Sequence, residues 1–223
     1  MKKGKLIVIE GACDGIGKTT QYNKLMERLK QDGFSVYNHH FPSYNTYQGK
    51  PVEKYLNGDY GTQNELSCYF INSLYATDRG VTWYEELKKE YDSGKIILLD
   101  RYTTSSLIYQ SSLLKTEKDK KEFIDFVEDF EYEKIGIKRP DLVIFLNANY
   151  DLVEKLRKNR DNYEGNSNDI HEKNNDFMKK VYENANFVAK YLSWNVVNCD
   201  DGNSMKSIDE IHNEIYKIIK ENM

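Results

Sequence analysis

The sequence is poor in cysteine and contains no long apolar run, and each shortage excludes a class of protein. Its three cysteines, Cys13, Cys68 and Cys199, lie far apart without metal-ligand spacing, which argues against a disulfide framework or a zinc site. The apolar run near the N-terminus, Leu6 to Ile9, is too short for a signal peptide or a membrane span. We therefore expect a cytoplasmic protein that does not enter a membrane.

The sequence also lacks an excess of basic charge and a recognisable linker. It contains 32 Lys and Arg residues and 36 Asp and Glu residues, so its net charge is -4. A protein that binds nucleic acid through a broad surface must neutralise many phosphates and therefore needs an excess of basic residues. No stretch rich in Pro, Gly or Ser divides the chain, and no repeat is visible. We expect a single domain over residues 1–223, without a nucleic-acid partner, in which local basic residues perform any phosphate chemistry.

Short apolar runs alternate with longer helical patterns along the chain. Strands are predicted at residues 6–9, 96–99, 142–146 and 194–197, with 34–37 as a weaker fifth. Helices are predicted at residues 18–30, 64–79, 83–91, 105–114, 118–132, 151–158, 172–192 and 208–220. This alternation indicates an α/β fold with a doubly wound, five-stranded parallel sheet flanked by helices. Active sites of such sheets gather at the carboxyl ends of the strands, here after Ile9, Leu99 and Leu146.

A glycine-rich loop follows the first predicted strand and leads into a helix. Its residues are Gly11, Ala12, Cys13, Asp14, Gly15, Ile16, Gly17, Lys18, Thr19 and Thr20. Backbone N–H groups and a helix N-terminus together form an anion site, so we expect this loop to bind the phosphates of ATP. Lys18 would contact the transferring phosphoryl group, and the Thr19 hydroxyl would bind Mg²⁺.

Two features of this loop leave alternatives open. A glycine-rich turn without a ligand is the simpler reading, which the strand before it and the Gly17, Lys18 and Thr19 sequence disfavour. The usual first glycine position is occupied by Ala12, with Gly11 one place too early. The loop therefore either has one extra residue or tolerates the methyl group of Ala12.

A carboxylate and a guanidinium stand together at the end of another predicted strand. Asp100 can hold the water shell of a metal ion, and Arg101 can form two parallel hydrogen bonds with a phosphate. The alternative is a structural ion pair that caps a helix.

Four motifs in this order are similar to those of the thymidylate kinases, a family of nucleoside monophosphate kinases with a phosphate-binding loop. They are the loop with its acidic residue, Phe41 with Pro42, Tyr75 with Arg79 one helical turn later, and the Asp100 block that reaches Tyr109. They span residues 8–110, and the remainder fits more loosely. The resemblance implies transfer of the γ-phosphoryl group of ATP to dTMP with Mg²⁺, a lid segment and a homodimer formed through helices.

The resemblance also implies individual roles for the acceptor site. Asp14 corresponds to a carboxylate that contacts the 3′-hydroxyl. Phe41, Pro42 and Tyr44 correspond to a segment that meets the acceptor phosphate, where many relatives have arginine at the place of Tyr44. A tyrosine there supplies no charge, so more of the electrostatic task falls to Arg101.

The base and sugar of the acceptor are assigned in the same way. Tyr75 would stack on thymine, and Arg79 would reach its O4 atom. Ser105 and Ser106 belong to the predicted substrate site, with Ser106 beside N3 of the base. Tyr109 would pack against the deoxyribose and exclude a 2′-hydroxyl.

A polar stretch later in the chain is the predicted lid, at about residues 157–170. Arg157 and Arg160 at its start are candidates for an arginine that stabilises charge on the transferring oxygens. The alternative is a solvated helix end, where basic residues are common.

Two other functions remain possible readings of the sequence. One is a broader deoxynucleoside monophosphate kinase or a deoxynucleoside kinase, although Phe41, Pro42 and Asp14 favour a monophosphate acceptor. The other is a catalytically weak nucleotide-binding regulator, for which the extra loop residue, Tyr44 and the bulky Ile108 are the arguments.

Overall fold

Five parallel strands form the centre of the computed structural model, which describes residues 3–13, 15–155 and 175–223. They are β1 (Lys5–Gly11), β2 (Val36–His40), β3 (Ile96–Asp100), β4 (Leu142–Asn147) and β5 (Asn195–Asn198). Their order in the sheet is β2-β3-β1-β4-β5, and every neighbouring pair is parallel. The five-stranded parallel sheet predicted from the sequence is confirmed.

The register of the sheet brings three chain segments to one edge. Ile9 of β1 lies opposite Asp100 of β3, and Gly11 lies opposite Leu146 of β4. The phosphate loop therefore leaves the sheet beside the ends of both neighbouring strands, because all strands point the same way.

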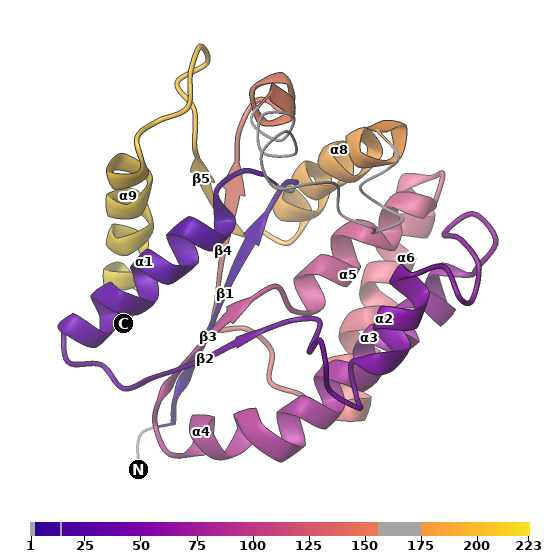
Figure 1. The fold of residues 1–223 in the computed structure, drawn as a ribbon, viewed down its shortest axis with the longest axis horizontal. Helices are drawn as coiled ribbons and strands as arrows, with labels where there is room; N and C mark the ends of the chain where they lie inside the picture. Colours follow the sequence, from indigo (N-terminus) through magenta and orange to yellow (C-terminus); the bar gives the residue numbers. More distant parts are fainter. Residues whose placement is uncertain (1–2, 14, 156–174) are drawn as a thin grey trace.

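Helices cover both faces of the sheet (Figure 1). On one side lie α1 (Lys18–Gln31) and α9 (Ile208–Glu221). The helices on the other side are α2 (Lys50–Leu56), α3 (Cys68–Thr82), α4 (Lys88–Asp92), α5 (Thr103–Tyr109), α6 (Glu117–Glu128) and α8 (Asn175–Tyr191). Among the described residues, no helix is long and apolar enough to cross a membrane.

The central strand β1 is buried on both of its faces. Ile7 belongs to the hydrophobic cluster that contains Leu25 of α1, whereas Val8 belongs to the cluster that contains Trp83 and Leu87. Successive side chains of a strand point to opposite faces, so both must be apolar when helices cover both. This double burial explains the unbroken apolar run of the sequence.

Several helix boundaries differ from the prediction. The predicted helix 64–79 begins only at Cys68, because the Ser67 side chain accepts a hydrogen bond from the Tyr69 N–H and caps it. No break follows residue 79, since α3 continues through a π-helical turn, η1 (Trp83–Leu87), into α4. A second π-helical turn, η3 (Asp129–Ile135), follows α6.

One helix of the structure is not predicted from the sequence, and two predicted helices lie only partly within the described residues. The short α2 is not predicted, and it buries Val52, Tyr55 and Leu56 after a proline in its first turn. The predicted helix 151–158 is helical through residue 155, and the predicted helix 172–192 is seen from Asn175.

Candidate active site

A cavity of about 250 Å³ opens at the carboxyl edge of the sheet. It is lined by Lys18, Thr19, His40, Pro42, Tyr44, Leu56, Tyr75, Asp100, Arg101, Ser105, Ser106, Tyr109 and Gln110. The sequence predicts ten of these residues, all except His40, Leu56 and Gln110. The phosphate loop, the segment after β2 and the Asp100 block therefore face one common space.

The phosphate loop needs glycine at two positions because of the backbone angle and at a third because a side chain packs closely against it. Gly15 and Gly17 have φ of 90°, a region that other residues rarely adopt. Gly11 has no such φ, but a Cβ atom there would lie 2.9 Å from Cγ2 of Ile16. Ala12 is fully buried and donates its N–H to the Leu146 carbonyl at 3.0 Å, so its methyl group is accommodated.

The Lys18 ammonium group, at the start of α1, and the Asp100 carboxylate, at the end of β3, form a buried ion pair. Lys18 Nζ donates to Oδ1 of Asp100, and His40 Nδ1 lies 3.1 Å from Oδ2. Burial by itself raises the pKa of Asp100, but the hydrogen bonds from His40 and Lys18 and the nearby charge of Arg101 lower the pKa far more. Asp100 is therefore ionised at neutral pH.

Arg101 lines the cavity, where its backbone is strained and its guanidinium contacts Ser105, Glu10 and Tyr109. Its φ is 65°, in the left-handed region. The guanidinium lies 3.4 Å from Ser105 Oγ and 3.8 Å from a carboxylate oxygen of Glu10, and its carbon is 5.5 Å from the Tyr109 ring centre. Arg101 thus presents a positive charge to the same cavity as Lys18.

Glu10 supports the site although the sequence analysis does not predict it. Its carboxylate is fully buried and accepts hydrogen bonds from Thr104 at 2.9 Å, Ser105 at 2.6 Å and the Gly11 N–H at 3.0 Å. These bonds connect the end of β1 to the start of α5. The sequence does contain a signal for this role, which is a single carboxylate directly after the apolar run Leu6 to Ile9. A carboxylate that is buried with such a run must be paired with hydrogen-bond donors or a positive charge.

The Phe41 and Pro42 segment connects β2 to the cavity. Phe41 is 2% exposed, packs on Tyr102 with ring centres 5.8 Å apart, and donates its N–H to the Asp100 carbonyl at 3.0 Å. Pro42 and Tyr44 line the cavity, and the Tyr44 ring stacks on His40. Phe41 is therefore a packing residue that positions the two lining residues.

Arg79 lies behind the cavity wall instead of lining it. It is 1% exposed and donates to Glu131 through two hydrogen bonds of 2.7 Å each. Its Nη2 also donates to the Ser106 hydroxyl at 2.9 Å, and Ser106 lines the cavity. Tyr75, one turn earlier in α3, does reach the cavity.

Three lining residues are missing from the sequence prediction for different reasons. Gln110 lies one helical turn after Ser106, so helical spacing on α5 could have indicated it. Leu56 belongs to α2, which the sequence does not reveal. His40 ends β2 and shows no local pattern that distinguishes it from a surface residue. Asp14, Arg157, Arg160 and the predicted lid lie outside the described residues.

The chain is similar in sequence and in fold to thymidylate kinases. The model of the thymidylate kinase family matches residues 9–215. A thymidylate kinase of Plasmodium falciparum (isolate 3D7) is 32% identical over 218 residues, covering 97% of this chain and 90% of the relative. One of Halothermothrix orenii is 31% identical over 219 residues, covering 98% and 97%. The thymidylate kinase structure of Candida albicans shares the fold with a TM-score of 0.74 at 24% identity, covering 99% of this chain and 92% of that one.

Proposed function

The chain belongs to the thymidylate kinase family, and on this premise we propose that it transfers the γ-phosphoryl group of ATP to dTMP, giving dTDP and ADP. The observation that supports this best is the common cavity, which Lys18 of the phosphate loop shares with Arg101 and with Tyr75, Ser106 and Tyr109. A donor site and a pocket for a flat base therefore adjoin each other.

The chemistry needs little more than positioning and charge. An oxygen of the acceptor phosphate is already anionic near neutral pH, so its attack on the γ-phosphorus requires no strong base. Lys18 would stabilise the transferring oxygens, and Arg101 would hold the acceptor phosphate in line with them. Because Asp100 is ionised and paired with Lys18, it keeps the lysine directed into the cavity.

The oxygen atoms at the cavity wall fit a magnesium ion. Thr19 supplies a hydroxyl and Asp100 a carboxylate, and both line the cavity. Within the described residues no group of three or more His, Cys, Asp or Glu side chains could hold a metal, so phosphate oxygens and water would complete the shell, as is usual for magnesium. When bound, the ion would neutralise charge on the β- and γ-phosphates.

The acceptor end of the cavity fits a pyrimidine deoxynucleotide. We assign stacking on the base to Tyr75, hydrogen bonding to Ser106 and Gln110, and contact with the deoxyribose to Tyr109. Gln110 is 3% exposed, and its amide can both donate to and accept from a base edge.

The remaining assignments concern the whole chain. We propose that residues 1–223 act as one kinase domain whose lid, about 157–170, supplies Arg157 or Arg160, and that Asp14 contacts the 3′-hydroxyl. A cytoplasmic location belongs to the same proposal.

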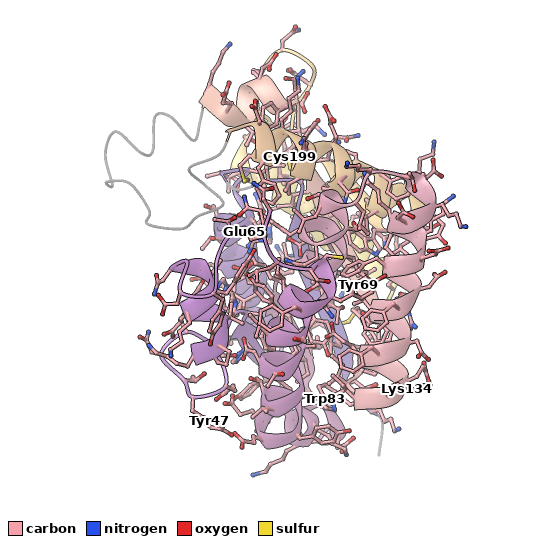
Figure 2. The ribbon with its side chains drawn as sticks, turned by 90° about the vertical axis from the view of Figure 1, so that its right-hand side faces the viewer. Tyr47, Glu65, Tyr69, Trp83, Lys134 and Cys199 are labelled. Carbon is pink, nitrogen blue, oxygen red and sulfur yellow. The ribbon has the colours of Figure 1, made fainter. Side chains whose placement is uncertain are left out.

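We also propose a homodimer that forms through the aromatic face, which comprises Tyr60, Tyr69, Phe70, Phe126 and Phe130. Figure 2 views this side of the molecule, with Tyr69 labelled.

A coupled assay of ADP formation with Mg²⁺-ATP and dTMP, dUMP, dCMP or thymidine tests the proposed function. We expect dTMP to be the best acceptor, and we expect Lys18→Ala to lower turnover by at least about 10³-fold, since charge stabilisation is the main catalytic term. Lys24→Ala, at a half-buried position on the same helix where the lysine pairs with Asp209 and does not line the cavity, is the matched control and should retain turnover.

Two outcomes would contradict this function. A preference for thymidine would indicate a nucleoside kinase, and slow hydrolysis indifferent to the acceptor would indicate a nucleotide-binding regulator. Near-normal phosphorylation of dTMP by Lys18→Ala would remove the phosphate loop from the mechanism.

A further inference from the structure

The turn that carries Pro42 and Tyr44 is fixed to helix α3 by a buried carboxylate. Both residues line the cavity, and the Tyr44 N–H donates to the Pro42 carbonyl at 2.8 Å, which closes a tight turn around Ser43. The Ser43 N–H donates to Oδ2 of Asp78 in α3 at 2.8 Å, and Asp78 is 1% exposed. Two cavity residues therefore depend on a contact with a neighbouring helix for their position.

The side chain of Ser43 strengthens this attachment. Its hydroxyl lies 3.1 Å from Oγ1 of Thr82, the last residue of α3, and 2.9 Å from Nε2 of His39 in β2. Thr82 also donates to Oδ1 of Asp78 at 3.4 Å. Ser43, Asp78 and Thr82 are all buried, and hydrogen bonds shielded from water hold their geometry more firmly than exposed ones. We call His39, Ser43, Asp78 and Thr82 the Ser43 cluster.

The helix that holds the turn also carries a residue of the base end of the cavity. Tyr75 precedes Asp78 by three positions in α3, so the two lie on neighbouring parts of the helix surface, and Tyr75 lines the cavity. The Tyr44 hydroxyl can donate to a phosphate oxygen, but such a bond forms only within a narrow range of distances. One helix therefore relates the place of the base to the place of the phosphate.

We propose that Asp78 is a positioning residue for the acceptor phosphate, which anchors the Ser43 backbone so that Tyr44 lies at the distance from Tyr75 that a nucleoside monophosphate spans. The inference rests on the proposed function and deepens it, because it names a contact that adapts the pocket to an acceptor with a phosphate. Asp78 does not line the cavity, so it would act only through the turn.

Asp78→Ala tests this role through the dissociation constants of thymidine and dTMP, measured by calorimetry. The two ligands share the base and the sugar and differ only in the phosphate. Without the carboxylate the turn is released, so we expect the ratio of Kd for thymidine to Kd for dTMP to fall by at least about tenfold, the effect of one hydrogen bond to a charged group. Kd for thymidine itself should not change.

Two further variants separate positioning from a structural role. Asp78→Asn keeps an oxygen that can accept from the Ser43 N–H, so it should retain the wild-type ratio. In a Tyr44→Phe background, Asp78→Ala should have no further effect on the ratio, because both act through one hydroxyl. A folding defect lowers the number of binding sites and not the ratio. Thr77→Ala, at an exposed position beside Asp78, is the matched control and should also retain the ratio.

A milder variant decides the matter if Asp78→Ala does not fold. Thr82→Val removes the hydroxyl that contacts both Ser43 and Asp78 but keeps a branched side chain, and we expect the ratio to fall about threefold, the effect of one neutral hydrogen bond. A wild-type ratio in folded Asp78→Ala, or in Thr82→Val, would overturn the inference and leave the kinase assignment intact. A wild-type protein that phosphorylates thymidine instead of dTMP would overturn the proposed function, and the inference with it.

Discussion

At the scale of single residues, the site depends on side chains whose partners are remote in sequence. Lys18 and Asp100 are 82 positions apart, and their pairing is possible because β1 and β3 are neighbours. Arg101, directly after Asp100, adopts φ of 65° so that its side chain turns toward the cavity. A non-glycine residue in this region costs roughly 1 to 2 kcal/mol, which the local contacts must offset.

Arg101→Ala and Arg101→Gly separate the cost of this backbone from the function of the side chain. Both variants lack the guanidinium, so turnover with dTMP should fall by at least about 10²-fold in each. Arg101→Gly should be more stable than Arg101→Ala by about 1 kcal/mol, because only glycine adopts this φ without strain. Urea denaturation of the two proteins measures the difference. Equal stability would show that the backbone at this position is not strained.

At the scale of elements, the packing and capping of helices stabilise the framework that carries the cavity. The C-terminal helix α9 packs along α1, whose first residue is Lys18. A capping box begins α9, since the Ser207 hydroxyl accepts from the Glu210 N–H at 3.2 Å and the Glu210 carboxylate accepts from the Ser207 N–H at 2.8 Å. This cap satisfies backbone donors at the start of α9, and neither Ser207 nor Glu210 lines the cavity.

Ser207→Ala is expected to destabilise the protein without changing its chemistry. Loss of this cap should lower the free energy of unfolding by about 1 kcal/mol. Turnover per folded molecule should remain that of the wild type, because Ser207 does not line the cavity. Urea denaturation and the ADP-coupled assay measure the two quantities. Asn213→Ala, at an exposed position of the same helix, is the control and should not lower stability.

At the scale of the whole molecule, helices α3 and α6 on one side of the sheet carry exposed aromatic side chains. Tyr69, Phe70 and Phe126 are 43%, 43% and 40% exposed, and Tyr69 contacts Phe126 with ring centres 4.9 Å apart. Phe126 in turn stacks on Phe130 at 5.6 Å. Adjacent exposed apolar rings favour association, which is the physical basis of the proposed homodimer.

Phe126→Lys is expected to weaken the homodimer. A charge placed in the aromatic face must be desolvated when two copies associate, so the variant should shift from dimer to monomer. Size-exclusion chromatography with light scattering, over a range of concentrations, measures the mass. Val196→Lys, at an exposed position of the edge strand β5, is the matched control. A wild-type protein that is monomeric at all concentrations would refute the homodimer directly.

Motifs along the chain were sufficient to predict much of the site. The phosphate loop, the Phe41 and Pro42 segment and the Asp100 block are each contiguous in sequence, and ten residues that the motifs indicate line one cavity. The role of Arg79 could not be predicted fully, because a spacing of four from Tyr75 says nothing about a carboxylate 52 positions away. Glu10 likewise finds Thr104 and Ser105 only in the folded chain.

Local backbone preferences and side-chain periodicity, which are properties of neighbouring residues, thus establish the strands, most helices and the phosphate loop of this protein. Partners from separate elements depend on strand order and packing, which no local pattern encodes. Placing β1 between β3 and β4 brings Lys18 to Asp100. Packing of η3 against α3 brings Glu131 to Arg79. The tertiary structure alone decides these two pairs, because each joins groups that meet only when distant elements pack together.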